Sequence, residues 1–362
     1  MRLLISAPFD ASADAGISLY VRRVIPHLAT RCQLTVLTPN PKLLSECGRV
    51  IAIPENVRFR IRRLTWVLTR LRAYCNGSYD ALLCLTPAVP IAAPLPAIAV
   101  VHDLTPLKVR ELNPITEKVS FWAGLQTLRC ADWVVTDSHS TLEDLAAASI
   151  LPRQRITVGY CGPGLLPSNA AADYAKQFIP YILYVGSHAP HKNVIRLIRS
   201  FARVVGTRNL KLVLVGDGSI EQLSHAARAI SEEGLQSRVT LLNRVPDAHL
   251  SSLYKHCQLL ACPSLYEGFG LPVLEAMLHG APIVCSSVSS LPEVAGDAAI
   301  LFDPLSVQDI ADKLQALLDN PALATRLSEA GRHRADLFTW ERTASAIYES
   351  VSALSAPSGR KR

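Results

Sequence analysis

Two acidic residues lie close together in an apolar stretch of the sequence, LYEGFGLPVLEAM. Glu267 and Glu275 are separated by seven residues, which comprise two glycines, one proline and four apolar side chains. Isolated glutamates usually face solvent, but this apolar setting argues against that interpretation. We therefore expect the two carboxylates to hold separate parts of one ligand.

The residues between the two glutamates predict the start of a helix. Pro272 suits the first position of a helix, so the segment 273–279 is expected to be helical and to end at Gly280. The backbone N–H groups and the positive end of the helix dipole then form a site for a phosphate or sugar oxygen. A second helix start is predicted by the S-x-x-E capping box from Ser290 to Glu293, with no role in the site. The loop at the first helix start consists of Gly268, Phe269, Gly270 and Leu271.

Both halves of the chain alternate short apolar strands with amphipathic helices, a pattern typical of a mostly parallel sheet that is covered on both faces. The expected strands are 3–6, 33–37, 81–85, 97–101 and 133–136 in the first half, and 181–185, 210–215, 239–242, 259–261 and 283–285 in the second. The expected helices include 18–28, 194–205 and 322–337. The sequence therefore predicts an α/β protein with two doubly wound, Rossmann-like domains that meet near residue 165 and face a central cleft.

Doubly wound sheets bind ligands beyond the carboxyl ends of their strands. A lone histidine there is more often structural, a lone lysine is more often surface charge, and a loop glycine is a weak signal. A functional role for such a residue can therefore be inferred only from the motif around it. The candidates at these positions are Gly16, His102, Gly186, Ser187, Lys192, Arg244 and Val245.

The stretch EGFGLPVLEAM resembles the E-x7-E motif of the family 4 retaining glycosyltransferases, whose two Rossmann-like domains form the GT-B fold. Further similar motifs are 181–193, 214–218, 289–297 and 338–340 in the second half, and 16–20 and 101–104 in the first. In such enzymes the last helix crosses back to the first domain. The resemblance therefore implies an acceptor-binding domain of residues 1–165 plus 341–362, and a nucleotide-sugar-binding domain of residues 166–340.

The resemblance also implies a role for individual residues. Glu267 would contact hydroxyls of the donor sugar and Glu275 the ribose hydroxyls, because carboxylates accept charge-assisted hydrogen bonds from diols. Lys192 would neutralise the diphosphate leaving group, and His102 would orient the sugar. The implied catalytic set is His102, Lys192 and Glu267. The implied donor-binding set is Gly16, Gly186, Ser187, Arg244, Val245, Gly268, Phe269, Gly270, Leu271 and Glu275.

At two positions the residue differs from the one found in many relatives. Ser187 and His191 each stand where relatives often have arginine. Other members of the mannosyl- and rhamnosyltransferase branch also have a small residue at the first position, and Asp103 beside His102 resembles the His-Asp pair of that branch. Activity is therefore still expected, with the second phosphate cation supplied from elsewhere, His191 being one candidate. The sequence has no DxD motif, and the family needs neither a metal nor another cofactor for this step.

The combination of HDLTPL, HKN and SSLPEVAGDAA is most similar to bacterial mannosyltransferases of surface-polysaccharide (O-antigen or exopolysaccharide) assembly. GDP-mannose is therefore the first expected donor, followed by an activated rhamnose or a UDP-hexose. The expected acceptor is a lipid-linked oligosaccharide. A nucleotide-sugar-binding relative without turnover is the alternative from another class. A dehydrogenase is disfavoured, because Glu221 stands at the third glycine position of the dinucleotide fingerprint.

The net charge of +7 and the pI near 9.0 favour an anionic partner. The segment 58–72 contains six arginines and no acid. A basic amphipathic helix with a tryptophan is typical of an interfacial membrane contact. A solvated surface helix whose apolar residues pack on the protein explains the segment equally well. Nucleic acid is less favoured, because no binding motif accompanies the charge. The apolar stripe comprises Leu64, Val67, Leu68 and Leu71, with Trp66 close to it.

The nine cysteines include no CxxC pair, so buried free thiols in a reducing cytoplasm are expected. The apolar run MRLLISAP is too short for a secretory signal, and no stretch approaches the ~20 apolar residues of a bilayer span. The expected location is the cytoplasm, peripheral on the inner face of the cytoplasmic membrane.

Overall fold

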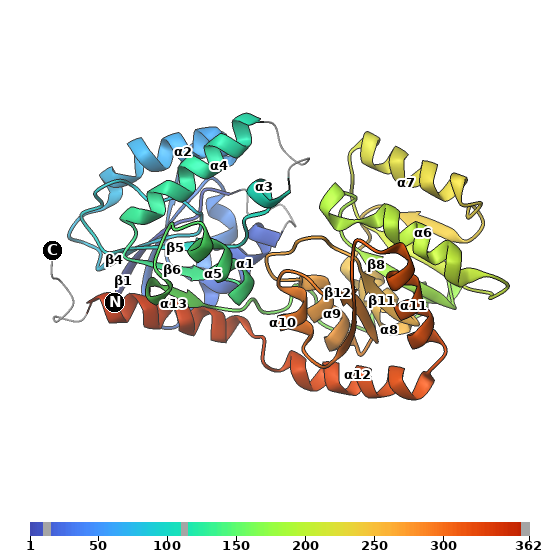
Figure 1. The fold of residues 1–362 in the computed structure, drawn as a ribbon. Helices are drawn as coiled ribbons and strands as arrows, with labels where there is room; N and C mark the ends of the chain where they lie inside the picture. Colours follow the sequence, from blue (N-terminus) through green and yellow to red (C-terminus); the bar gives the residue numbers. More distant parts are fainter. Residues whose placement is uncertain (10–15, 110–114, 356–362) are drawn as a thin grey trace. The chain divides into compact units, whose positions relative to one another are not determined.

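The computed structural model of the 362-residue chain describes residues 1–9, 16–109 and 115–355. The chain forms two compact units (Figure 1). Unit 1 consists of Met1–Gly162 and Thr339–Arg362, and unit 2 of Pro163–Phe338. These boundaries lie within a few residues of the domain limits expected from the sequence.

Unit 1 is built on a seven-stranded parallel sheet with the order β3-β2-β1-β4-β5-β6-β7. Its strands are β1 Arg2–Ser6, β2 Gln33–Thr38, β3 Arg49–Ala52, β4 Ala81–Cys84, β5 Ala97–Val101, β6 Trp133–Thr136 and β7 Ile156–Val158. Every residue of β4 and β5 is buried. Parallel strands that are covered on both faces read as unbroken apolar runs, which explains why the sequence predicts them well.

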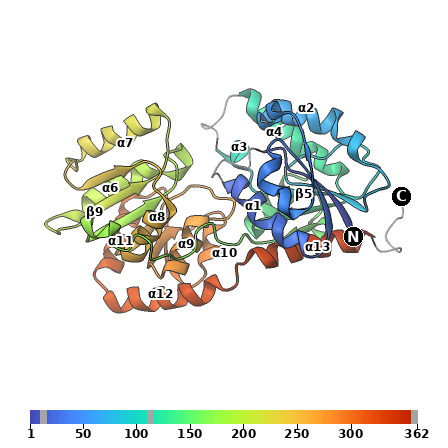
Figure 2. The same ribbon diagram turned by 180° about the vertical axis from the view of Figure 1, so that it is seen from behind.

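The α-helices of unit 1 are α1 Gly16–Ala29, α2 Arg60–Thr69, α3 Thr105–Lys108, α4 Ile115–Thr127, α5 His139–Ala147 and α13 Trp340–Ser355. The helix α2 lies beside α4, and α13 packs along α1 (Figures 1 and 2). The ring of Trp340 at the start of α13 meets the ring of Tyr20 on α1 edge to face, with 5.4 Å between centroids. The C-terminal helix is therefore part of the unit formed by the N-terminal half.

Unit 2 contains a six-stranded parallel sheet with the order β10-β9-β8-β11-β12-β13. Its strands are β8 Tyr181–Val185, β9 Lys211–Val215, β10 Val239–Leu242, β11 Leu259–Cys262, β12 Ile283–Ser286 and β13 Ala299–Phe302. Its α-helices are α6 Val194–Val205, α7 Ile220–Glu232, α8 Asp247–His256, α9 Leu271–His279, α10 Leu291–Ala295, α11 Val307–Leu318 and α12 Pro321–Ala335. The helix α6 packs against α7 and α11, and α9 packs against α8, α10 and α12.

The sheet order of unit 2 reverses between β8 and β11. From β8 the chain proceeds to β9 on one side, whereas from β11 it proceeds to β12 on the other side. Loops that leave a sheet in opposite directions open a crevice at its carboxyl edge, and ligands of this fold bind there. The loops after β8 and β11 are therefore the ones that position a site.

The basic segment 58–72 packs against unit 1 through its apolar stripe. Trp66 is only 7% exposed and Val67 is fully buried, and both belong to a core cluster that includes Leu125 of α4. Of the two interpretations of this segment, a helix packed by its apolar stripe agrees with the buried tryptophan, because the stripe faces the core. A membrane contact through the arginines stays a prediction. The apolar side chains exposed at the start of α2 are Phe59 and Ile61, at 55% and 53%.

Candidate functional site

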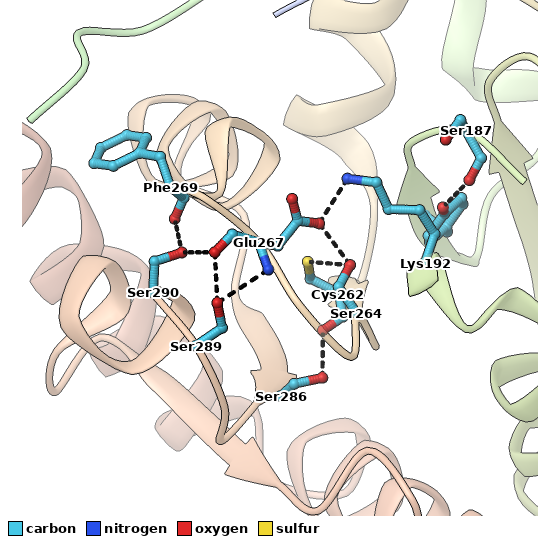
Figure 3. Close-up of polar contacts among 10 residues, drawn as sticks. Ser187, Lys192, Cys262, Ser264, Glu267, Phe269, Ser286, Ser289 and Ser290 are labelled. Atoms are coloured by element: carbon cyan, nitrogen blue, oxygen red, sulfur yellow. Dashed lines mark hydrogen bonds and ion pairs between the residues drawn. The ribbon is translucent and has the colours of Figure 1, made fainter. Parts of the chain in front are cut away.

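An ion pair joins the two loops at the reversal point of the unit 2 sheet. Lys192 ends a short 3-10 turn after β8, and its Nζ lies 2.7 Å from Oε1 of Glu267 in the loop after β11 (Figure 3). The Ser264 hydroxyl donates to the same carboxylate oxygen at 2.6 Å. The lysine and glutamate side chains are 18% and 12% exposed, so the pair is well shielded from water.

The surroundings of Glu267 keep its carboxylate charged. Burial alone would raise its pKa, but the ammonium of Lys192 and the hydroxyl of Ser264 together lower the pKa below its usual value. The site therefore contains a pair of opposite charges that neutralise each other. The ammonium of Lys192 is suited to bind a diphosphate, and the carboxylate of Glu267 is suited to accept a hydrogen bond from a sugar hydroxyl.

Main-chain and amide contacts fix the two loops to each other. The buried side chain of Asn193 donates to the carbonyl oxygens of Pro263 and Pro304 at 2.9 and 2.8 Å. The N–H of Leu265 donates to the carbonyl of His191 at 2.7 Å. The positions of Lys192 and Glu267 are therefore set by the backbone on both sides.

Two serines hold the loop between Glu267 and α9. The N–H of Glu267 donates to Ser289 Oγ at 3.1 Å, and Ser290 Oγ donates to the carbonyl oxygens of Glu267 and Phe269 at 3.0 and 2.7 Å (Figure 3). The expectation of a capping box at Ser290 is wrong, because this hydroxyl makes no cap bond to α10 and supports the site loop instead.

The helix α9 begins at Leu271, two residues earlier than the sequence predicts, and ends at Gly280 as expected. Gly270 precedes it with φ of 109°, and a Cβ atom there would lie 2.7 Å from Leu291 Cδ2. Only glycine adopts this conformation easily, so the loop can turn sharply into the helix. The side chain of Phe269 is buried against Phe338, which leaves only its main chain to contact a ligand.

Glu275 lies in the second turn of α9 and is almost fully buried. The hydroxyl of Tyr254 on α8 donates to its Oε2 at 2.9 Å, and the main chain of Leu165 also bonds to it. Burial raises the pKa of Glu275 to about 7, although both hydrogen bonds oppose that shift. The carboxyl group therefore titrates near neutral pH in the unliganded state. The sequence gives no signal for Tyr254, because the contact depends on how α8 packs against α9.

The loop after β8 carries two neutral histidines. Burial and the charge of Lys192 lower the pKa of His191 to about 4, and burial lowers the pKa of His188. His191 therefore brings no positive charge at neutral pH, which argues against it as the second phosphate cation. Gly186 and Gly216 bring this loop against the loop after β9, since a Cβ at Gly216 would lie 1.9 Å from the Gly186 carbonyl oxygen.

The remaining candidates of unit 2 are Ser187, in the loop after β8, and Arg244 and Val245, in the loop after β10. Ser187 accepts a hydrogen bond from Tyr184 through its carbonyl (Figure 3). Arg244 is exposed and Val245 half-buried in the loop after the edge strand β10. Unit 2 thus brings Lys192 and Glu267 together; most of its other candidates share their two loops or lie on α9, and Arg244 and Val245 lie on a separate loop.

Two candidates belong to unit 1. His102 directly follows β5, and its Nδ1 lies 2.7 Å from Oδ2 of Asp137, which directly follows β6. Gly16 is the exposed first residue of α1, and a Cβ there would meet nothing within 4 Å. Its predicted role in donor binding stays a prediction, and the residues that precede it, 10–15, lie outside the described part of the chain.

Comparison with known proteins gives two family matches. Residues 15–163 match the model "Glycosyltransferase Family 4", and residues 175–334 match "Glycosyl transferases group 1". The chain is 29% identical over 256 residues to an O-antigen chain mannosyltransferase B of Escherichia coli, covering 68% of this chain and 67% of the relative. It is 35% identical over 179 residues to an MMP alpha-(1->4)-mannosyltransferase of Mycolicibacterium hassiacum, covering 48% of this chain and 43% of that relative.

A solved structure supports the same architecture. HepE of Anabaena in complex with UDP and glucose superposes with a TM-score of 0.78 at 18% identity, covering 98% of this chain and 100% of that one. The two parallel sheets of the present chain are therefore those of a GT-B fold, as the sequence predicts.

Proposed function

Because the chain belongs to the family 4 glycosyltransferases, we propose that it is a retaining mannosyltransferase that uses GDP-mannose. The observation that carries this proposal is the pairing of Lys192 with Glu267 beside the N-terminus of α9. A cation, a helix N-terminus and a carboxylate at one sheet edge suit the phosphates and the hydroxyls of a nucleotide sugar. The mannosyl preference is supported by the similarity to the O-antigen chain mannosyltransferase.

In the proposed reaction the donor replaces the internal ion pair. The diphosphate takes the ammonium of Lys192, and the freed carboxylate of Glu267 accepts hydrogen bonds from hydroxyls of the sugar. Glu275, once ionised, accepts those of the ribose. The bond between sugar C1 and the diphosphate oxygen then breaks, while the acceptor oxygen bonds to C1 from the same face.

The proton of the acceptor hydroxyl passes to the departing diphosphate, so the products are the glycoside and GDP. Lys192 and the helix dipole of α9 stabilise the charge that develops on the leaving oxygen. We further propose that no divalent metal or other cofactor is needed, because the ammonium and the helix terminus supply the positive charge. Chelation by EDTA should then leave turnover unchanged.

We propose a lipid-linked oligosaccharide as the acceptor, met at the inner face of the cytoplasmic membrane. No helix in the described ranges is both long and apolar enough to cross a bilayer. The surface of α2 and α4 is suited to peripheral contact instead. On α4, Ile115, Val119 and Trp122 form a stripe that is 79%, 59% and 54% exposed, and the basic helix α2 lies beside it. Exposed apolar side chains next to arginines fit an anionic lipid surface.

The test is transfer by the purified protein in the presence of a bacterial membrane lipid extract. GDP-mannose, a dTDP-activated rhamnose and UDP-glucose are supplied in turn, and both nucleotide release and label in the lipid fraction are measured. Release of GDP with mannose in the lipid fraction is the expected result. Turnover of another donor would leave the glycosyltransferase activity in place but show that the proposed donor sugar is wrong. Binding of nucleotide sugars without turnover of any would overturn the proposed activity in favour of a binding protein.

A further inference from the structure

Two polar side chains of unit 1 meet because of strand register. The strands β5 and β6 are parallel neighbours, and Val101 pairs with Thr136 at their carboxyl ends. The next residues, His102 and Asp137, therefore leave the sheet side by side. Their 2.7 Å contact joins the carboxylate to Nδ1 of the ring, with side chains that are 12% and 6% exposed.

The other nitrogen of the ring has no hydrogen-bond partner among the described residues. His102 Nε2 is buried and makes no hydrogen bond within the described part of the chain, and the same holds for the hydroxyl of Tyr20. Buried polar atoms in folded proteins are almost always satisfied by protein, water or ligand. An imidazole that is fixed at one nitrogen and vacant at the other is suited to receive a ligand atom.

The groups packed around His102 define its charge state. They are the carboxylates of Asp137 and Asp103, the ring of Tyr20 at 4.7 Å between centroids, and the thiol of Cys161 beside Asp137. Burial lowers the pKa of His102, but the two carboxylates outweigh it and raise the pKa above its usual value. Burial also holds the tyrosine and the cysteine protonated, so they add no competing charge.

We propose that Asp137 is a positioning residue for His102: it anchors Nδ1, fixes the plane of the ring and leaves Nε2 to bind a sugar hydroxyl. The identity of the ligand rests on the proposed function, whereas the anchoring does not. A carboxylate bonded to Nδ1–H selects one tautomer and stabilises the imidazolium, which a neutral partner would do less well.

The first test is independent of turnover. The titration of His102 is followed by NMR on ¹³C-histidine-labelled protein, with the signal assigned from His102→Gln. Asp137→Asn should lower the pKa of His102. Asp132→Asn is the matched control, since this carboxylate also binds across β5 and β6, accepting from Ala97 N at 2.8 Å, without touching the histidine. An unchanged His102 titration in Asp137→Asn would overturn the proposal, even if no donor is turned over.

The second test is a double-mutant cycle on donor turnover. Asp137→Asn retains an oxygen that can accept from Nδ1–H, whereas Asp137→Leu removes it, so kcat should fall more in the leucine variant, by about tenfold or more. In the His102→Ala background neither change at residue 137 should lower kcat further, because the aspartate acts through the ring. Additive losses would show a merely structural role and overturn the proposal.

Discussion

Lys192 and Glu267, which are 75 positions apart in the sequence, meet at 2.7 Å between Nζ and Oε1. The lysine ends the loop after β8 and the glutamate lies in the loop after β11, the two strands between which the sheet reverses. Each group provides the other with a charged partner. Under the proposed function, donor binding separates them, and the ion pair holds both side chains in place until the donor binds.

Replacement of Lys192 should affect both turnover and stability. Lys192→Ala removes the positive charge that would stabilise the leaving diphosphate, so kcat should fall by about 100- to 1000-fold. It also leaves the buried Glu267 carboxylate without its cation, and breaking a buried pair destabilises by roughly 3–5 kcal/mol. Steady-state kinetics and thermal unfolding measure the two effects.

The control is Lys313→Ala, since this lysine is 40% exposed and its nearest acid lies 3.9 Å away. That change should alter neither quantity. In Lys192→Ala combined with Glu267→Gln, stability should recover while turnover stays low. A double variant that is as unstable as Lys192→Ala alone would contradict the role of the pair.

Glu275 should make stability depend on pH. Its pKa is about 7 in the folded chain against 4.5 ordinarily, so the folded state binds the proton more tightly than the unfolded state does. The contribution is fully present below about pH 4.5 and is lost as pH rises through about 7. Glu275→Gln cannot titrate, so the melting temperature of the wild type should decline relative to this variant between pH 5 and pH 7.5. Parallel curves would show that this carboxyl does not carry the effect.

The same titration should appear in nucleotide binding. An ionised carboxylate is the better acceptor for ribose hydroxyls, so the affinity for GDP should rise with pH across neutrality. Tyr254→Phe removes a hydrogen bond that favours the ionised form and should move this rise to higher pH. Calorimetric titration at several pH values measures both. A pH-independent affinity in the wild type would contradict the assignment of Glu275.

His191 should contribute little charge to phosphate binding. Its ring is neutral at pH 7, because burial and Lys192 lower its pKa to about 4. His191→Gln should therefore change the KM for the donor by less than about tenfold, the equivalent of roughly 1.4 kcal/mol. His191→Arg should tighten GDP binding. A large loss in the glutamine variant would show that the histidine becomes charged when the donor binds.

The exposed stripe of α4 should control contact with lipid. Trp122→Ser removes a 54% exposed indole without disturbing the core and should reduce sedimentation with anionic phospholipid vesicles. Trp66→Ala is the contrasting change, because that indole is 7% exposed in the core. It should lower stability by about 3–5 kcal/mol. Equal vesicle binding by the wild type and Trp122→Ser would contradict the proposed surface.

The fold could be predicted from the sequence where burial leaves a local signal. The strand β8 lies at the expected residues because a strand covered on both faces is an unbroken apolar run. The helix α9 is marked by Pro272 and Gly280 at its ends. These signals are properties of neighbouring residues in the chain, so a single sequence carries them.

Contacts that depend on sheet order or helix packing could not be predicted in this way. The Lys192–Glu267 pair requires β8 to neighbour β11, and the His102–Asp137 pair requires β5 to neighbour β6. The capping-box pattern at Ser290 fits a helix start. In the structure, however, its hydroxyl donates to the carbonyl oxygen of Phe269 in the loop before α9 and not to a backbone group of α10. The apolar residues of α2 around Trp66 recur with helical periodicity. The same periodicity is found in helices that pack on a core and in helices that lie on a membrane, so it cannot distinguish the two.

The most direct measurement of the central claim is release of GDP from GDP-mannose by the wild type, Lys192→Ala and Glu275→Ala, with Lys313→Ala as the control. We predict release by the wild type and the control, and rates at least about 100-fold lower in the two site variants. Equal release by all four proteins, or tight donor binding with no release by any, would contradict the proposal that this site transfers mannose.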